Sequence, residues 1–231
     1  MRVHVAFTPE ERFGAPVSVV VDVLRATSTI AQALASGYRR VLCCAEIEEA
    51  TALRDAEGGG ILAGERKCVR IPGFDLGNSP TEFVEPIGDT VVLTTTNGTR
   101  ALVTAAARST HVLAGSLLNL GAVVEAARQL CDDVVVVCAG VQGEPTVDDV
   151  YCAGRIAGLL GGEPTDGARL AIRIAESYRD AVEGLSASQS ARNLVAASLD
   201  SDIAYCARES ALQVVPRLVG LRGTAVELAA S

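Results

Sequence analysis

The chain has 231 residues and a formal net charge of −8. This surplus of acidic groups argues against a general nucleic-acid-binding surface, because such surfaces neutralise phosphates with Lys and Arg. No apolar run approaches the roughly 18 residues of a membrane-spanning helix, and charged residues fill the N-terminal stretch where a signal peptide is apolar, so we expect a cytoplasmic protein with neither nucleic acid nor membrane as a partner.

The cysteines bear on the compartment and on metal binding. There are seven, an odd number, and no two form a Cys-x-x-Cys pair. We therefore expect reduced, structural thiols in a cytosolic chain. His4 and His111 have no partner at metal-ligand spacing, Lys67 is the only lysine, and we assign none of the three a role. The cysteines are Cys43, Cys44, Cys68, Cys131, Cys138, Cys152 and Cys206.

The first 65 residues alternate between strand and helix patterns, which implies a parallel sheet. The apolar and β-branched runs predict strands at residues 1–8, 17–21, 40–44 and 61–65. Between them, helices are expected at residues 28–35 and 46–56. The run from Val17 to Val21 is the kind expected of a strand that is buried on both faces.

Residues 66–90 are rich in Pro and Gly, which prevents long regular elements. A loop of this length inside a compact domain is usually functional or disordered. Four apolar side chains resemble anchors and argue against disorder. They are Ile71, Phe74, Leu76 and Phe83. We therefore predict a long active-site loop.

After residue 90 the pattern begins again. Strands are expected at residues 91–94, 111–115 and 134–140, and helices at 99–107, 120–130 and 147–160. At a nearly constant offset, Asp22 aligns with Thr94 and Gly64 with Gly140, which indicates an internal duplication. The rest of the chain reads as helices at 167–185, 193–199 and 203–210, followed by a short strand at 214–219 and a final strand or loose tail.

These elements predict an α/β fold of two similar α/β/α halves with largely parallel sheets and a helical C-terminal region. The first half would comprise residues 1–90 and the second residues 91–231, unless both form one compact unit. A hydrophobic content of 49% leaves room for a homodimer.

The turn from Thr94 to Thr99 links a buried strand to a helix start. Unpaired N–H groups and the positive end of the helix dipole make such a turn a natural anion site. The same residue types also serve as ordinary caps, so the turn alone leaves both interpretations open.

Five polar motifs each lie at the carboxyl end of a predicted strand, and ligands bind at the carboxyl ends of parallel strands. We therefore expect the motifs to share one edge of the sheet. They offer carboxylates for a hard cation, at Asp22, Glu65, Asp148 and Asp149, and bases for an anion, at Arg25 and Arg66. Oxygen ligands without His or suitable Cys favour Mg²⁺ over zinc, and Mg²⁺ with Arg and helix N–H groups is typical of phosphoryl transfer.

Six motifs together resemble the 2-phosphosulfolactate phosphatase family, over roughly residues 1–220. They are Asp22–Thr27 (DVLRAT), Gly64–Arg66 (GER), Ile71–Pro80 (IPGFDLGNSP), Thr94–Thr99 (TTTNGT), Gly115–Asn119 (GSLLN) and Cys138–Gly140 with Asp148–Gly154 (CAG and DDVYCAG). The resemblance implies a Mg²⁺-dependent phosphatase that converts 2-phospho-3-sulfolactate to 3-sulfolactate, a step towards coenzyme M in methane-forming organisms.

Two departures from the family pattern stand out. The family often has Glu-Asp where this chain has Asp148-Asp149. It commonly has a His-Gly-Arg-x-Leu element where this chain has Ser190 to Leu194, with Ser190 in place of His. The substrate is therefore less firmly indicated than the chemistry.

The predicted site combines both arguments around a small anionic phosphorylated substrate. Catalytic roles are assigned to Asp22, Arg25, Glu65, Arg66 and Asp149. Substrate binding is assigned to Thr27, Asn78, Ser79, Thr95, Thr96, Asn97, Gly98, Thr99, Ser116 and Asn119. Mg²⁺ ligation is assigned to Asp22, Glu65, Asp148 and Asp149.

Three points stay open from the sequence. Asp22 could attack phosphorus covalently or position a water. The substrate could be another small phosphorylated hydroxy acid, or the protein could bind a small anion without catalysis. The carboxylate cluster weighs against a pure anion binder, since like charges beside the ligand would oppose binding.

Overall fold

The computed structural model describes residues 1–130 and 133–230. Its strands are β1 (Arg2–Ala6), β2 (Val17–Val21), β3 (Arg40–Cys44), β4 (Ile61–Arg66), β5 (Val69–Arg70), β6 (Thr90–Thr94), β7 (His111–Gly115), β8 (Asp133–Cys138), β9 (Glu163–Pro164), β10 (Pro216–Arg222) and β11 (Ala225–Ala230). The predicted strands are confirmed with small shifts at their ends, and the last segment is a strand rather than a tail.

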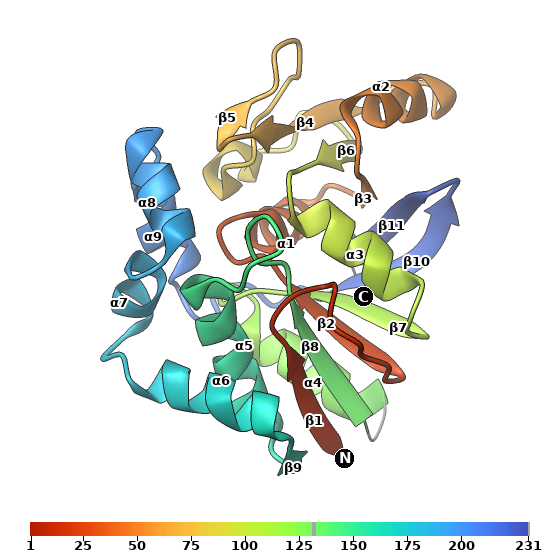
Figure 1. Cartoon of the computed structure of the whole chain (residues 1–231). Helices are drawn as coiled ribbons and strands as arrows, with labels where there is room; N and C mark the ends of the chain where they lie inside the picture. The colour runs from red at the N-terminus through yellow and green to blue at the C-terminus, as the bar shows by residue number, and fades with distance from the viewer. Residues whose placement is uncertain (131–132, 231) are drawn as a thin grey trace.

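All of these strands belong to one sheet, in the order β5-β4-β6-β3-β11-β10-β7-β2-β8-β1-β9. Two parallel groups lie within it, β4-β6-β3 and β7-β2-β8-β1, seen at the top and the lower right of Figure 1. The antiparallel hairpin β10–β11 joins them, with β10 antiparallel to β7 and β11 antiparallel to β3. An α/β fold with a large, mostly parallel sheet is thus confirmed.

Because three antiparallel pairings separate β3 from β7, the two groups run in opposite directions along the sheet. The prediction of a single shared edge is therefore wrong in this detail. The carboxyl ends of the two groups instead point to opposite edges in the strand order, yet residues that follow β2 and β6 line one cavity.

Strands from both sides of residue 90 alternate in the sheet. β6 lies between β3 and β4, and β2 lies between β7 and β8. The group β4-β6-β3 thus has one strand from the later stretch of the chain, and the group β7-β2-β8-β1 has two strands from each stretch. The internal duplication and the division at residue 90 stay predictions.

The helices are α1 (Ala26–Ser36), α2 (Ile47–Ala56), α3 (Gly98–Ala106), α4 (Leu120–Leu130), α5 (Val147–Leu160), α6 (Asp166–Glu176), α7 (Ala181–Ser186), α8 (Gln189–Ala196) and α9 (Ser201–Cys206), with a short 3₁₀ helix, η1 (Pro80–Phe83). One predicted helix, 167–185, is wrong, since the structure has α6 and α7 there. The chain breaks because the Asp180 side chain accepts a hydrogen bond from the Glu183 N–H and starts a new helix.

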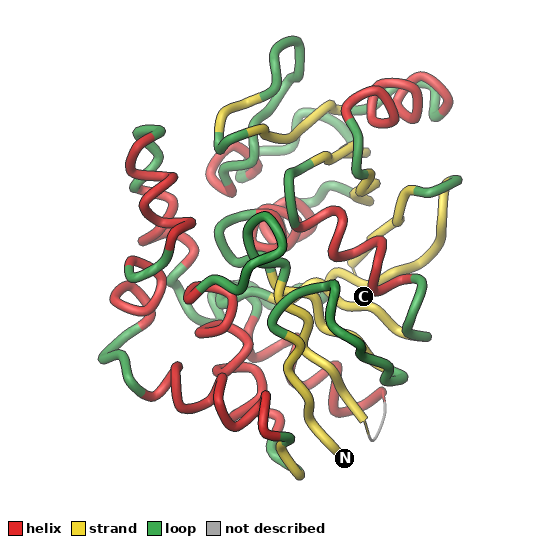
Figure 2. Tube along the Cα trace, viewed as in Figure 1, coloured by secondary structure: helices red, strands yellow, loops and turns green. Residues whose placement is uncertain are grey.

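Helices cover both faces of the sheet (Figure 2). On β2, Val17, Val19 and Val21 pack in one core cluster with α4, α5 and α6. Val20 points the other way and packs in a second cluster with α1 and α3. This alternation confirms the prediction that β2 is buried on both faces, and it fixes the end of β2 between the two helix layers.

Among the described residues, six cysteines are free thiols, as predicted, while Cys131 lies outside those residues. No helix within the described ranges is long and apolar enough to cross a membrane.

Candidate functional site

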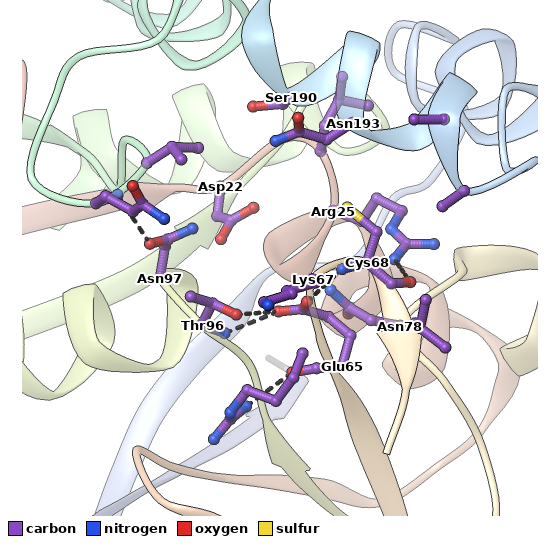
Figure 3. A pocket seen from close by; sticks show the side chains of 17 residues that line it. Asp22, Arg25, Glu65, Lys67, Cys68, Asn78, Thr96, Asn97, Ser190 and Asn193 are labelled. Carbon is purple, nitrogen blue, oxygen red and sulfur yellow. Dashed lines mark hydrogen bonds between the residues drawn. The ribbon is translucent and has the colours of Figure 1, made fainter. Parts of the chain in front are cut away.

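A cavity lies beside the turns that follow β2, β4 and β6. Its volume is about 710 Å³ (Figure 3). Asp22 and Arg25 line it from the turn after β2, and Thr96 and Asn97 from the turn after β6. The prediction that these two turns face a common cleft is confirmed. The other lining residues are Leu24, Glu65, Arg66, Lys67, Cys68, Val69, Asn78, Val141, Gln142, Ser190, Asn193, Ala196 and Ala197.

Asp22 lies at the end of β2, against the first turns of two helices. Its Oδ1 accepts a hydrogen bond from the N–H of Ala26, at the start of α1, at 3.2 Å. Its Oδ2 lies against Gly98, at the start of α3, where an added Cβ would come within 2.6 Å of it. Gly98 is thus the residue that makes room for this carboxylate between the two helix starts.

The Asp22 carboxyl is poised to change its charge near neutral pH. Burial raises its pKa to about 7, and the negative charges of Asp148 and Glu65 add to the rise. The Ala26 N–H and the Arg25 charge act in the opposite direction. A buried acid with a raised pKa in a cleft is typical of functional sites, because it gains most from a bound cation or a proton transfer.

Glu65 is held by the turn that we predicted to bind the substrate. Its Oε1 accepts hydrogen bonds from the Thr96 N–H and hydroxyl, at 2.8 and 2.9 Å. Its Oε2 accepts from the Cys68 N–H at 2.8 Å. Thr96 lines the cavity, and its donors are bonded to Glu65 in this structure, so its predicted contact with the substrate stays a prediction. Glu65 is fixed at the cavity wall with its charge in place.

Arg25 is anchored by a partner that the sequence did not reveal. Its guanidinium donates to Asp202 Oδ2 at 2.7 Å and to the Cys68 carbonyl at 2.9 Å. The Arg25 and Asp202 side chains are only 2% and 1% exposed. The Ser79 hydroxyl donates to the other Asp202 oxygen at 2.6 Å. Ser79 thus supports Arg25 through Asp202 instead of lining the cavity.

Arg66 and Asn78 both line the cavity, as predicted. The Arg66 guanidinium donates to the carbonyls of Glu65 and Ala45 and to the Thr94 hydroxyl. These acceptors are neutral, so they orient the guanidinium without cancelling its charge. Asn78 is 4% exposed, and its Oδ1 is a buried oxygen without a hydrogen-bond partner in the described structure. Such an orphaned acceptor fits a site that awaits a ligand.

Asp148 and Asp149, at the start of α5, lie behind the cavity and do not line it. Asp149 accepts from the N–H groups of Val23 and Gly140, both at 2.9 Å, and so ties the end of β2 to the end of β8. Asp148 accepts from the Ser190 hydroxyl at 3.2 Å. Burial raises the pKa of both carboxyls. The contacts of Asp149 hold the turn that carries Asp22, while the predicted metal-binding and catalytic roles of the pair stay predictions.

The remaining predicted substrate-binding residues brace the turns from behind. The Thr27 hydroxyl donates to the Asp22 carbonyl, and the Thr99 hydroxyl to the Thr95 carbonyl. Asn119 accepts from Ser116 and donates to the carbonyls of Ala114 and Val214. Side chains in these positions are fully buried or nearly so, and outside the cavity lining. They are Thr27, Thr95, Thr99, Ser116 and Asn119.

The four predicted Mg²⁺ ligands do not converge. Within residues 1–130 and 133–230, no group of three or more His, Cys, Asp or Glu side chains could hold a metal ion. Mg²⁺, however, usually keeps several waters and binds through one or two carboxylates and substrate phosphates. Asp22 and Glu65 both line the cavity and meet that smaller requirement. Burial is the main cause of the raised Asp22 pKa, and the negative charges of Asp148 and Glu65 add to it; a bound cation would offset both effects.

Sequence reasoning missed several residues of the site. Lys67, Gln142 and Asn193 line the cavity, and Asp202 holds Arg25. Only Lys67 carried a signal, as the single lysine of the chain directly after the Gly64–Arg66 motif. The others come from distant segments without a recognisable motif.

Comparisons with known proteins show the family of this chain. The family model of 2-phosphosulpholactate phosphatase matches residues 4–220. A probable 2-phosphosulfolactate phosphatase of Thermus thermophilus is 40% identical over 234 residues, covering 98% of each chain. The 2-phosphosulfolactate phosphatase of Methanothermobacter thermautotrophicus is 38% identical over 216 residues, covering 94% of this chain and 92% of its own. This chain therefore belongs to the 2-phosphosulfolactate phosphatase family.

Proposed function

We propose that the protein is a Mg²⁺-dependent phosphatase that hydrolyses 2-phospho-3-sulfolactate to 3-sulfolactate and phosphate. Family membership over residues 4–220 supports the reaction. The observation that carries the site assignment is the Asp22 carboxyl, which is buried at the cavity wall, has a pKa of about 7 and lies between two helix starts. A phosphate monoester resists unaided hydrolysis strongly, so a site of this kind must supply concentrated charge.

The roles follow from the contacts of each side chain. Asp22 and Glu65 would hold Mg²⁺ together with water and substrate oxygens. When bound, the ion would polarise the phosphoryl group and offset its negative charge. Arg66 would add positive charge, since its acceptors are neutral oxygens, and Arg25 would offer a guanidinium group that Asp202 and the Cys68 carbonyl hold in place. Asn78 Oδ1 would accept a hydrogen bond from a substrate hydroxyl or a water.

A second candidate is the hydrolysis of another small phosphorylated hydroxy acid. Ser190 lines the cavity and donates to Asp148 at the position where the family commonly has His. A hydroxyl in place of an imidazole removes a group that could carry positive charge. This change favours a relaxed choice of substrate by the same chemistry.

Phosphate release from purified protein tests the activity. With Mg²⁺ we expect turnover of 2-phospho-3-sulfolactate, and a chelator should lower the rate by about 10²-fold or more, because the metal contributes several kcal/mol of charge stabilisation. Added Mg²⁺ should restore the rate. Absence of release from both phosphosulfolactate and 2-phospholactate would contradict the hydrolase. Full activity after chelation would contradict the Mg²⁺ requirement alone.

We further propose a cytoplasmic location and a role in making coenzyme M. The free thiols of the described residues support the location, because the cytosol keeps thiols reduced. The homodimer remains a prediction.

A further inference from the structure

We propose that Lys67 is a specificity-determining residue, whose ammonium group pairs with a second acid group of the substrate, the sulfonate that phosphosulfolactate has and phospholactate lacks. This inference rests on the proposed function. It assigns the site to phosphorylated acids that carry an acid group beyond the phosphate and the carboxylate. Four features of the structure support it: the turn, its anchors, the charge of the cavity and the freedom of the ammonium group.

Lys67 occupies a turn that its sequence does not favour locally. β4 ends at Arg66 and β5 begins at Val69, so Lys67 and Cys68 form a two-residue hairpin loop. Their φ angles are 55° and 67°, both in the left-handed region. Asn-Gly is the preferred pair for such a loop, and residues with larger side chains are disfavoured there. Local stability therefore does not explain a lysine at this position.

The backbone of the turn is bonded to the site. The Cys68 N–H donates to Glu65 Oε2 at 2.8 Å, and the Cys68 carbonyl accepts from Arg25 at 2.9 Å. These bonds hold the residue next to Lys67 against two charged side chains of the cavity. Lys67 itself lines the cavity and lies near the centre of the close-up in Figure 3. The backbone at Lys67 is thus held in place, while its long side chain can still adopt different conformations.

The charges around the cavity leave one cation unengaged. Arg25 is paired with Asp202, and Arg66 donates to two carbonyls and one hydroxyl. Among the described residues, the Lys67 ammonium has neither a hydrogen bond nor an ion pair within 4.0 Å in the structure, although it lines the same cavity. Of the three described basic side chains that line the cavity, Lys67 is the one whose N–H groups are all available to a ligand.

A substrate with three acid groups needs such a cation. Asp22 and Glu65 already place negative charge in the cavity, and each further acid group of a ligand would be repelled unless a positive group meets it. In the proposed function Mg²⁺ would offset the charge of the phosphoryl group, and Arg25 and Arg66 already donate to groups of the protein. An ammonium on a flexible stem at the cavity mouth can pair with the additional sulfonate without any change in the phosphate site.

Two substrates and four proteins test the inference. The specificity constant kcat/KM would be measured for 2-phospho-3-sulfolactate and for 2-phospholactate, which differ by the sulfonate. The four proteins are the wild type, Lys67→Met, Lys67→Arg and Arg192→Met, a control that also removes one positive charge. Arg192 lies on α8 outside the cavity lining and bonds to Gln189 and Ala187. The wild type should prefer phosphosulfolactate, and Lys67→Met should lower that preference about tenfold, as expected for a lost bond to a charged group. Lys67→Arg and Arg192→Met should keep it within about threefold.

The outcomes separate this inference from the proposed function. If the wild type hydrolyses neither substrate, the proposed function fails and this inference fails with it. If the wild type is active and Lys67→Met leaves the preference unchanged, or lowers both rates equally, the proposed function stands and the role of Lys67 is overturned. Should Lys67→Met fail to fold by its melting temperature, Lys67→Gln gives the same comparison with a neutral, polar side chain.

Discussion

Replacement of Asp22 by Asn is expected to lower kcat by about 10³-fold while the protein stays folded, since positioned acid–base or nucleophilic groups contribute 10²- to 10⁴-fold. Asn keeps the size of the side chain and an oxygen that can accept from the Ala26 N–H. It loses the negative charge that would hold Mg²⁺ and activate or deliver the nucleophile. Steady-state phosphate release and a melting curve measure the two effects separately.

Asp75→Asn is the matched control for this experiment. The Asp75 carboxylate also accepts a backbone N–H, that of Leu62, at 2.9 Å, but it is exposed and outside the cavity lining. We expect its kcat to stay within about twofold of the wild type. If Asp22→Asn retained most of the activity, or if Asp75→Asn lost as much, Asp22 would not be the central carboxylate of the reaction.

The pH dependence of kcat/KM should reflect the ionisation of the Asp22 carboxyl. Because the free Asp22 pKa is raised to about 7, its ionised form is lost as the pH falls below that value. At limiting Mg²⁺, kcat/KM should therefore fall about tenfold per pH unit on the acid side of an apparent pKa near 7. Asp148→Asn removes a neighbouring negative charge, so it should move this limb to lower pH. If the apparent pKa of the acid side did not change in Asp148→Asn, the titrating group would be one other than Asp22.

Replacement of Asp202 by Ala is expected to give the largest loss of stability, about 3–5 kcal/mol, because it leaves the buried Arg25 charge without its partner. The Ser79 hydroxyl would lose its acceptor at the same time. Urea unfolding, followed by circular dichroism, measures the change. The loss of stability in Asp202→Ala would come from leaving Arg25 unpaired, and not from the mere absence of a charge at position 202.

The double variant Arg25→Met with Asp202→Leu separates these explanations. It replaces both ions by apolar side chains of similar size, so stability should return to within about 1–2 kcal/mol of the wild type. Activity should stay low, since the arginine of the cavity is gone. A double variant as unstable as Asp202→Ala would show that packing, and not charge pairing, is lost.

Much of this fold could be predicted because its strands and helices carry strong local patterns. The apolar run from Val17 to Val21 identifies a strand covered on both faces, and the helix from Leu120 to Leu130 begins and ends where its pattern does. The exchange of β2 and β6 between the two strand groups could not be predicted. It depends on pairing between distant segments, for which the sequence offers no local signal.

The candidate site divides in the same way. Asp22, Arg25 and Glu65 were found because they follow strands and belong to motifs. The hydrogen bonds from Thr96 to Glu65 could not be predicted, because a turn that suits a substrate anion suits a carboxylate of the chain equally well. Asp202 was missed because its only link to the site is its contact with Arg25, and a position in a short C-terminal helix gives no hint of that contact.

A crystal structure with Mg²⁺ and 3-sulfolactate or phosphate tests the central claim most directly. We expect the ion in the cavity with the Asp22 carboxylate as a ligand, the anion beside Arg25 and Arg66, and Asp149 still bonded to the N–H groups of Val23 and Gly140. An ion held instead by Asp148 and Asp149, or an anion bound outside this cavity, would contradict the claim that the two facing turns form one catalytic site around Asp22.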